Sequence, residues 1–426
     1  MTAPTTAATI EKIPYADPTL FIQRWPTELP LLYFGGPYPW AFLALAGRTT
    51  TWEAISKAKI NFPKTPSEPK IPFTGGYMGV LPYDYGGITT SNQEYPVAFE
   101  INHVLAFNRS SKTAYLCMKS QSRNDFQISP RKCLSLQPQL DLKDQAPGIT
   151  LKTQCHDDDY LEAATKVIQQ INQGRYYQLN LLRYFDVDLP LAADLLTRFH
   201  LSHNPMGMWY RWSNHELISF TPERLAQIRP KGSKLILTTQ PIKGTCPASD
   251  DQKINTKLSK ELASSIKDQA ELNMIIDLLR NDMNTVSNKG TVQVTSTGTV
   301  NRFDTVLHRV ATITSHLKEN LSFGEFINAL FPGGSITGAP KVEVMKAIWE
   351  FENRNRNFFM GSAFFFDQHQ GSFDSNILIR TIHRNNTKMT YAAGSGIVSR
   401  SVPIAECNEI KNKCRVLENP IPSTIR

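Results

Sequence analysis

Short apolar runs recur through the first third of the chain, a pattern typical of β-strands. The clearest runs are residues 40–45 and 114–118, and glycine pairs at 35–36 and 75–76 predict turns. A stretch rich in Ser, Asn, Gln and Pro follows at 120–156. We place a soft boundary there, between an N-terminal region (1–150) and a C-terminal region (151–426), and expect both to form one intertwined globule.

Beyond this boundary the apolar residues recur at the spacing typical of a helix. Asp159 is a suitable N-cap and Gly174 a suitable end for one helix. Its apolar face carries Leu161, Ala164, Val167, Ile168 and Ile171. A strand is predicted at 176–187, and further helices at 262–281, 340–352 and 404–416. Helices mixed with hairpin strands favour an α+β fold with mainly antiparallel pairing over a doubly wound parallel fold.

Composition narrows the class of protein. The chain has 426 residues, of which 41% are hydrophobic and 20% charged, so a packed core is expected. No apolar run approaches the length of a membrane span, and the N-terminus lacks the features of a secretory signal. We therefore expect a cytoplasmic protein that does not enter a membrane.

The net charge of +8 is spread along the chain without a basic run. This pattern favours a solvated basic surface and gives no support for nucleic-acid binding. The six cysteines show no metal-ligand spacing, so a zinc site is not expected. None of them lies in a G-x-C-x-G context, so no glutaminase nucleophile is predicted.

A predicted hairpin brings a carboxylic acid close to a lysine. Strands at 225–228 and 234–239 flank a turn, which sets Glu223 opposite residue 240 and a few positions from Lys243. A lysine at a strand end, followed by Gly244, can be desolvated and become nucleophilic, and a neighbouring carboxylic acid can protonate a leaving hydroxyl. The spacing alone favours the simpler interpretation, an ordinary ion pair across the hairpin.

Carboxylates recur at three-residue spacing on two predicted helices. Asp268 and Glu271 share one helix face, to which Asp282 should return eleven residues after Glu271. The second pair is Glu406 and Glu409. Oxygen ligands without His or Cys suit Mg²⁺. Each pair alone is more typical of a solvated helix face, and Glu409 with Lys413 also fits a surface ion pair.

Two further segments could bind an anion. The glycine-rich stretch 331–341 leads into a helix with Pro340 in its first turn, which fits either an anion site or a plain turn. A hairpin with arms 374–383 and 388–396 should set Arg380 alongside Tyr391, where a guanidinium can hold a carboxylate or simply line the core edge. His308, taken alone, is interpreted as a buried structural imidazole.

Together and in this order, the segments resemble the chorismate-utilising family. Its members include anthranilate, aminodeoxychorismate, isochorismate and salicylate synthases. The matching stretches are residues 177–180, 221–224, 241–245, 277–282, 331–341, 379–381 and 393–398, with weaker similarity at 37–40 and 75–85. The resemblance covers essentially all of 156–416. It implies a large sandwich of two orthogonally packed, mainly antiparallel sheets with outer helices.

The resemblance also implies a Mg²⁺-dependent chorismate site. Its principal metal ligands would be Glu271 and Glu409, with Asp268 and Glu406 close by. Substrate contacts are implied for Gly244, Thr245, Ser335, Phe359, Arg380, Gly394, Gly396 and Lys413. His308 would lie near the substrate ring or its leaving group. Phe359 stands where many relatives have Tyr.

Two positions separate the chemistries within this family. Water-adding relatives have a lysine base where this chain has Gln178, and an amide cannot deprotonate water. Anthranilate-forming relatives typically have Ala where this chain has Lys243, which resembles the lysine of the aminodeoxychorismate-forming members. The implied reaction is attack of Lys243 on C2 of chorismate with loss of the C4 hydroxyl, assisted by Glu223. Ammonia then adds at C4 and expels the lysine.

The resemblance thus implies formation of 4-amino-4-deoxychorismate, used for para-aminobenzoate and folate. A separate glutamine amidotransferase subunit would supply the ammonia, because the chain shows no glutaminase motif. The alternatives are anthranilate formation, or a weakly active paralogue that binds a ligand without turnover.

Overall fold

The computed structural model describes residues 8–36, 38–63, 69–86, 94–119, 124–129, 132–133, 145–188, 192–202, 204–249, 251–303 and 306–421. Most of the expected boundary stretch between 120 and 144 lies outside these residues, as does position 37 of the weaker N-terminal similarity.

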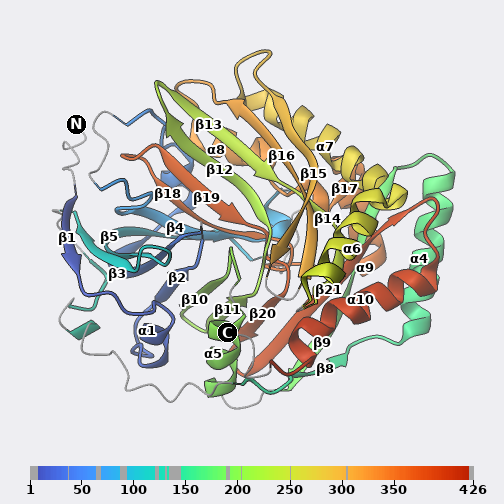
Figure 1. The fold of residues 1–426 in the computed structure, drawn as a ribbon, viewed down its shortest axis with the longest axis horizontal. Helices are drawn as coiled ribbons and strands as arrows, with labels where there is room; N and C mark the ends of the chain where they lie inside the picture. The colour runs from blue at the N-terminus through green and yellow to red at the C-terminus, as the bar shows by residue number, and fades with distance from the viewer. Residues whose placement is uncertain are drawn as a thin grey trace.

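The described strands form one large antiparallel sheet (Figure 1). In chain order they are β1 (Thr9–Ile13), β2 (Leu31–Phe34), β3 (Trp40–Thr50), β4 (Gly76–Leu81), β5 (Val97–Asn108), β6 (Thr113–Met118), β7 (Phe126–Gln127), β8 (Thr150–Thr153), β9 (Gln178–Asp188), β10 (Met208–Trp212), β11 (His215–Ser219), β12 (Arg224–Lys231), β13 (Lys234–Gln240), β14 (Ile242–Pro247), β15 (Gln293–Phe303), β16 (Val306–His316), β17 (Gly338–Ala339), β18 (Ser362–Asp367), β19 (Ser372–Asn376), β20 (Thr381–Asn385) and β21 (Lys388–Val398). Hydrogen bonds link them continuously, so the layers of the sandwich belong to one network.

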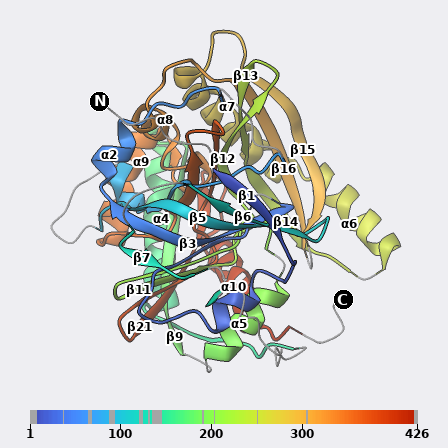
Figure 2. The same ribbon diagram turned by 90° about the vertical axis from the view of Figure 1, so that its left-hand side faces the viewer.

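The helices lie mainly around the strands of the C-terminal region. They are α1 (Leu20–Gln23), α2 (Trp52–Ser56), α4 (Asp157–Asn172), α5 (Ala192–Leu201), α6 (Gln252–Ser264), α7 (Ile266–Val286), α8 (Phe323–Leu330), α9 (Lys341–Glu352) and α10 (Pro403–Glu418), with short 3₁₀ turns η1 (Tyr83–Gly86) and η2 (Gly334–Ile336). Figure 1 shows α4, α6, α7, α9 and α10 gathered at one side and β1 to β5 at the other, and Figure 2 shows α6 projecting from the body. The expected α+β class is confirmed.

Strands from both halves of the chain pair directly. β2 pairs with β10 and β4 with β18, so N-terminal strands extend the sheet of the C-terminal region. The apolar residues that alternate along these strands fill two buried clusters, the smaller of which includes Phe34, Phe42, Phe73 and Phe365. Burial of large aromatic side chains makes such clusters the main source of stability.

Local expectations were confirmed at most elements and wrong at the starts of two helices. The helix expected at 262–281 is α7, which begins at Ile266, after α6 ends at Ser264. The predicted strands at 40–45, 114–118 and 176–187 and the helices at 340–352 and 404–416 are present. Asp159 is not the N-cap of α4. His156 caps the helix, and Asp159, three residues later, accepts a 3.0 Å hydrogen bond from the His156 N–H. A helix can therefore begin earlier than its first good capping residue when an acidic residue completes a capping box.

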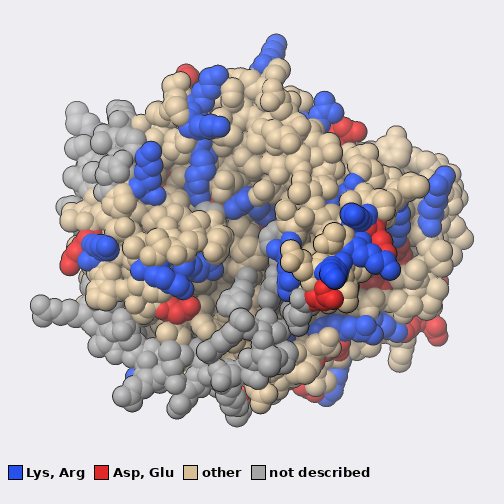
Figure 3. Space-filling view, in the orientation of Figure 1, with Lys and Arg blue, Asp and Glu red and all other residues tan. Residues whose placement is uncertain are grey.

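The surface carries its basic residues in a scattered arrangement. Figure 3 shows Lys and Arg singly and in small groups over one face, with Asp and Glu interspersed near α4 and α10. All six cysteines are free thiols. Over the part of the chain that the structure describes, no helix combines the length and apolar character needed to cross a bilayer.

Candidate active site

Lys243 lies where β14 begins, at an irregularity in its pairing with β16. The register shifts between Ile242 and Thr245, and Gly244 adopts a left-handed φ of +84°. A side chain at position 244 would place its Cβ 3.0 Å from Asp268 Cγ, so glycine lets the strand approach the start of α7. Lys243 Nζ lies 3.9 Å from Glu271 Oε2 on that helix, and only 14% of each side chain is exposed. The fold thus directs this lysine inward.

Glu223 is buried beside the same strand. Its Oε1 accepts a 2.8 Å hydrogen bond from Ser335 Oγ in η2. Burial raises the pKa of Glu223, against the opposing effects of the Ser335 hydroxyl, the charge of Lys243 and the Ile242 N–H. A buried carboxyl with a raised pKa can serve as a general acid.

The ion pair of Lys243 is with Glu271 on α7 rather than with Glu223 across the hairpin. The simpler interpretation of the hairpin, an ordinary Lys243–Glu223 ion pair, is therefore wrong. The predicted hairpin itself is confirmed, because Arg224, the neighbour of Glu223, pairs with Gln240.

The expected metal ligands come from the first two turns of α7 and of α10. Lys267 Nζ stands between them, 3.8 Å from Glu271 Oε1 and 3.9 Å from Glu406 Oε1. Glu409 is paired instead with Lys413, whose Nζ lies 2.7 Å from Glu409 Oε1. Burial raises the pKa of Glu271, and the charges of Glu409 and Asp268 act in the same direction, whereas Lys243 and Lys267 oppose it.

This donor set suits a hard divalent cation, because it consists of carboxylates that repel one another in a partly buried place. As the side chains stand, no group of three or more His, Cys, Asp or Glu among the described residues is close enough to hold an ion. The lysines supply the compensating positive charge. Mg²⁺ binding at this place would thus require Lys267 to move aside.

The site also contains the imidazole of His308, which lies near the guanidinium of Arg380. Thr245 Oγ1 and His308 Nδ1 are 2.8 Å apart, and these two residues pair across β14 and β16. Burial lowers the pKa of His308 to about 3, and the nearby charge of Arg380 contributes, so the imidazole is neutral at pH 7. Arg380 itself has a left-handed φ of +51°.

The expected pairing of Arg380 with Tyr391 is wrong. Tyr391 pairs with Ile382, because β20 begins only at Thr381 and Arg380 belongs to the irregular segment before it. The left-handed backbone at Arg380 interrupts the long arm that the sequence predicted. Arg380 nevertheless lies near enough to Tyr391 and Glu223 for their charges to act on its pKa, which burial lowers.

The β21 glycines face β9. Gly396 pairs with Asn180 and Gly394 with Leu182. Lys413 Nζ donates a 2.8 Å hydrogen bond to the Gly394 carbonyl. A Cβ on Gly396 would lie 3.1 Å from Gln178 Nε2 and 3.2 Å from Lys243 Nζ, so the bare backbone leaves space between these two groups.

Gln178 marks this space as a place for a polar ligand. Both polar atoms of its side-chain amide are buried without a hydrogen-bond partner among the described residues. A buried amide of this kind is costly unless something completes its hydrogen bonds.

Two further residues singled out from the sequence have well-defined partners of their own. Asp282 does not join the carboxylates of α7. It lies three turns along α7 from Glu271, as its spacing implies, and its Oδ2 binds Lys341 Nζ at 2.7 Å. Phe359 is buried and packs edge-on against Tyr184 at 5.9 Å, behind β9.

Lys267 and Arg224 are residues near the site that our sequence interpretation did not single out. Lys267 precedes Glu271 by four positions, and this helical ion-pair spacing could have indicated it. Arg224 contacts residues of two other strands, and no local sequence pattern predicts such contacts.

Comparison with known proteins places the chain in a family. Residues 38–419 match the chorismate binding enzymes. The chain is 33% identical over 369 residues to aminodeoxychorismate synthase component 1 of Escherichia coli K12, covering 80% of this chain and 76% of that relative. It is 36% identical over 267 residues to the component 1 of Salmonella typhimurium, a match that covers 62% of this chain and 57% of the relative's length.

The fold has solved counterparts. The anthranilate synthase component I of Streptococcus pneumoniae superposes with a TM-score of 0.72 at 22% identity, covering 96% of this chain and 99% of that structure. This likeness bears on the fold alone. With the family match over most of its length, the chain belongs to the family of chorismate binding enzymes.

Proposed function

We propose that this protein is the chorismate-aminating component of an aminodeoxychorismate synthase, with Lys243 as a covalent nucleophile. The observation that carries the proposal is the placement of Lys243. Its Nζ points into the space between Gln178, Gly396 and Glu271, next to a buried carboxylic acid. The similarity to proteins named aminodeoxychorismate synthase component 1 supports the same assignment.

The first step joins Lys243 to the substrate. The Lys243 nitrogen, as the free amine, forms a bond to C2 of chorismate while the bond between C4 and its hydroxyl breaks. Glu223 in its protonated form gives its proton to the departing hydroxyl, which leaves as water, and the resulting Glu223 carboxylate takes up the proton that the lysine nitrogen loses. The raised pKa of Glu223 supports this acid role.

Ammonia completes the reaction. It adds at C4, the bond between C2 and Lys243 breaks, and the two ring double bonds return to the positions they have in chorismate, which gives 4-amino-4-deoxychorismate. Gln178 supports amination over water addition, because an amide cannot act as the base that activates water. A glutamine amidotransferase subunit would deliver the ammonia, in keeping with the component 1 names of the relatives.

Binding groups complete the proposed site. Arg380, Ser335 and Lys413 would hold the substrate carboxylates, and neutral His308 would face the ring. Glu271 and Glu409, with Asp268 and Glu406, would hold Mg²⁺. When bound, Mg²⁺ would neutralise a substrate carboxylate and the surrounding acidic side chains.

Product identification tests the assignment. The protein is incubated with chorismate, Mg²⁺ and ammonium, and the products are separated and identified by mass spectrometry. The proposal predicts 4-amino-4-deoxychorismate. Anthranilate and pyruvate as the products would show an anthranilate synthase, and no conversion with any ammonia source would indicate a binding paralogue.

A further inference from the structure

Two neighbouring residues, Glu223 and Arg224, both interact with the segment that directly precedes Lys243. Neighbouring residues of an extended chain point in opposite directions. The Glu223 carboxylate lies close enough to the Ile242 N–H, directly before Lys243, for that N–H to lower its pKa. The Arg224 guanidinium donates through Nη1 to the side-chain oxygen of Gln240, three residues before Lys243.

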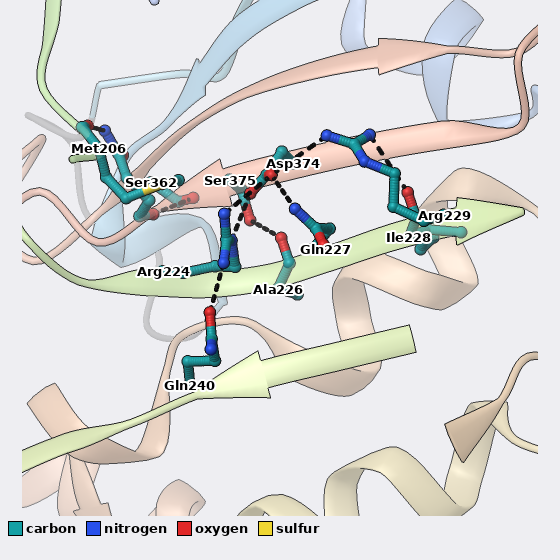
Figure 4. Close-up of polar contacts among 11 residues, drawn as sticks. Met206, Arg224, Ala226, Gln227, Ile228, Arg229, Gln240, Ser362, Asp374 and Ser375 are labelled. Carbon is teal, nitrogen blue, oxygen red and sulfur yellow. Dashed lines mark hydrogen bonds and ion pairs between the residues drawn. The ribbon is translucent and has the colours of Figure 1, made fainter. Parts of the chain in front are cut away.

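Arg224 is itself fixed by a buried carboxylate on a third strand. Its Nε donates to Asp374 Oδ1 at 2.9 Å and its Nη2 to Asp374 Oδ2 at 3.3 Å. Figure 4 shows the guanidinium between Asp374 on β19 and Gln240 on β13. Gln227 Nε2 donates to Asp374 Oδ2 at 2.5 Å, so the carboxylate is held in turn. A bidentate guanidinium–carboxylate pair fixes orientation as well as distance.

These side-chain contacts lie where the backbone ladder is irregular. The pairing of β12 with β13 shifts register between Arg224 and Gln227, and its pairing with β19 shifts between Arg224 and Ala226. A bulge leaves residues without regular ladder hydrogen bonds and redirects nearby side chains. Arg224 therefore links the start of β12 to both neighbouring strands. It does so at the point where regular backbone hydrogen bonds between the strands are interrupted.

We propose that Arg224 is a positioning residue, which sets the distance between Glu223 and Lys243 through Gln240 and Asp374. It acts without touching the substrate. The predicted effect on kcat rests on the proposed function, whereas the predicted position of Lys243 does not. Because positioning of reacting groups contributes strongly to rate, loosening this tie should lower kcat more than substrate affinity.

Gln240→Leu is the sharpest variant, because it removes the acceptor of Arg224 and leaves the Arg224–Asp374 pair intact. We expect kcat to fall about tenfold while KM for chorismate stays within about twofold. Gln240→Glu, which restores an acceptor, should recover most of the loss. Arg229→Lys is the matched control, since Arg229 Nη2 lies 3.5 Å from Asp374 Oδ2, whereas the Gln240 side-chain oxygen accepts from Arg224.

A second measurement does not need turnover. The rate at which acetic anhydride labels Lys243 in the whole protein, followed by peptide mass spectrometry without chorismate, reports how firmly the lysine is held. We expect labelling about threefold faster in Gln240→Leu and unchanged in Arg229→Lys. Folding of each variant is checked by circular dichroism and thermal unfolding.

The outcomes separate the two proposals. Unchanged kcat and labelling in a folded Gln240→Leu protein would overturn the positioning role, as would equal losses in Arg229→Lys. If the wild-type protein makes no aminodeoxychorismate but labelling still accelerates only in Gln240→Leu, the positioning of Lys243 is supported and the proposed function fails.

Discussion

Lys243 Nζ lies 3.2 Å from the point that a side-chain carbon on Gly396 would occupy. The two residues are on separate strands, β14 and β21, and the bare glycine backbone forms one wall of the space in front of the lysine. The same point is 3.1 Å from Gln178 Nε2. The absence of a side chain at position 396 is therefore what keeps the lysine and the amide open to a ligand.

Gly396→Ala should lower kcat/KM for chorismate by about tenfold or more, because the methyl group intrudes on the lysine and the substrate. The thermal unfolding temperature should change little, since the crowded atoms are the ends of side chains that can shift. Steady-state kinetics and calorimetry measure both. Gly394→Ala is the contrast: its Cβ would lie 2.7 Å from the Leu181 carbonyl oxygen, so that variant should lose stability. A Gly396→Ala enzyme with wild-type kcat/KM would contradict this account of the space.

Ser335→Ala should move the alkaline limb of the pH profile of kcat to higher pH. The Ser335 hydroxyl stabilises the ionised form of Glu223 and so opposes the rise in pKa that burial causes. Removing it raises the pKa further, and the acid form persists to higher pH. Ser335→Thr keeps the hydroxyl and should leave the limb in place. A limb that moves to lower pH in Ser335→Ala would exclude Glu223 as the acid.

Acid should destabilise the fold through His383. This imidazole is buried against His215, their Nε2 and Nδ1 atoms being 3.0 Å apart, and burial lowers its pKa from 6.5 to about 4. Its contribution to stability is complete above pH 6.5 and is lost as the pH falls toward 4, because the unfolded chain takes up the proton first. Between pH 7 and pH 5 this loss should reach about 2 kcal/mol.

Urea unfolding at the two pH values tests this effect. His383→Gln, which cannot take up a proton, should lose correspondingly less stability on acidification. His308, also of lowered pKa, is present in both proteins and cancels from the difference. Identical losses in wild type and His383→Gln would show that His383 is not responsible.

Lys267→Met should tighten divalent-cation binding. The Lys267 ammonium stands between Glu271 and Glu406, where it competes with a metal ion for the carboxylates. Since 59% of its side chain is exposed, we expect a gain of only about threefold. Glu271→Gln should weaken binding at least about tenfold, because it removes a charged oxygen ligand. Titration with Mn²⁺ followed by electron paramagnetic resonance measures both, and weaker binding in Lys267→Met would refute the competition.

The sequence predicted the parts of the fold that depend on local pattern. Short apolar runs and helical periodicity located β3, β6, β9, α9 and α10, and the hairpin that leads from Glu223 to Lys243 was located by its turn. These features follow from side chains close together in the chain.

What could not be predicted depends on contacts between distant segments. Arg380 breaks its strand with a left-handed backbone, and Asp282 turns to Lys341 on another helix. The ion pair of Lys243 with Glu271 joins residues that only the packing of α7 on β14 brings together. The spacing of residues along the chain does not predict such contacts. The similarity to relatives shows the family of the chain and not these contacts.

The central claim is that Lys243 bonds to the substrate, and intact-protein mass spectrometry tests it most directly. The protein is incubated with chorismate and Mg²⁺, without ammonium, and compared with Lys243→Ala. We predict that the wild-type protein gains the mass of chorismate less one water, that peptide mapping places it on Lys243, and that the variant gains nothing. A Lys243→Ala protein that gains the same mass, or that forms aminodeoxychorismate from chorismate and ammonium at the wild-type rate, would contradict the account.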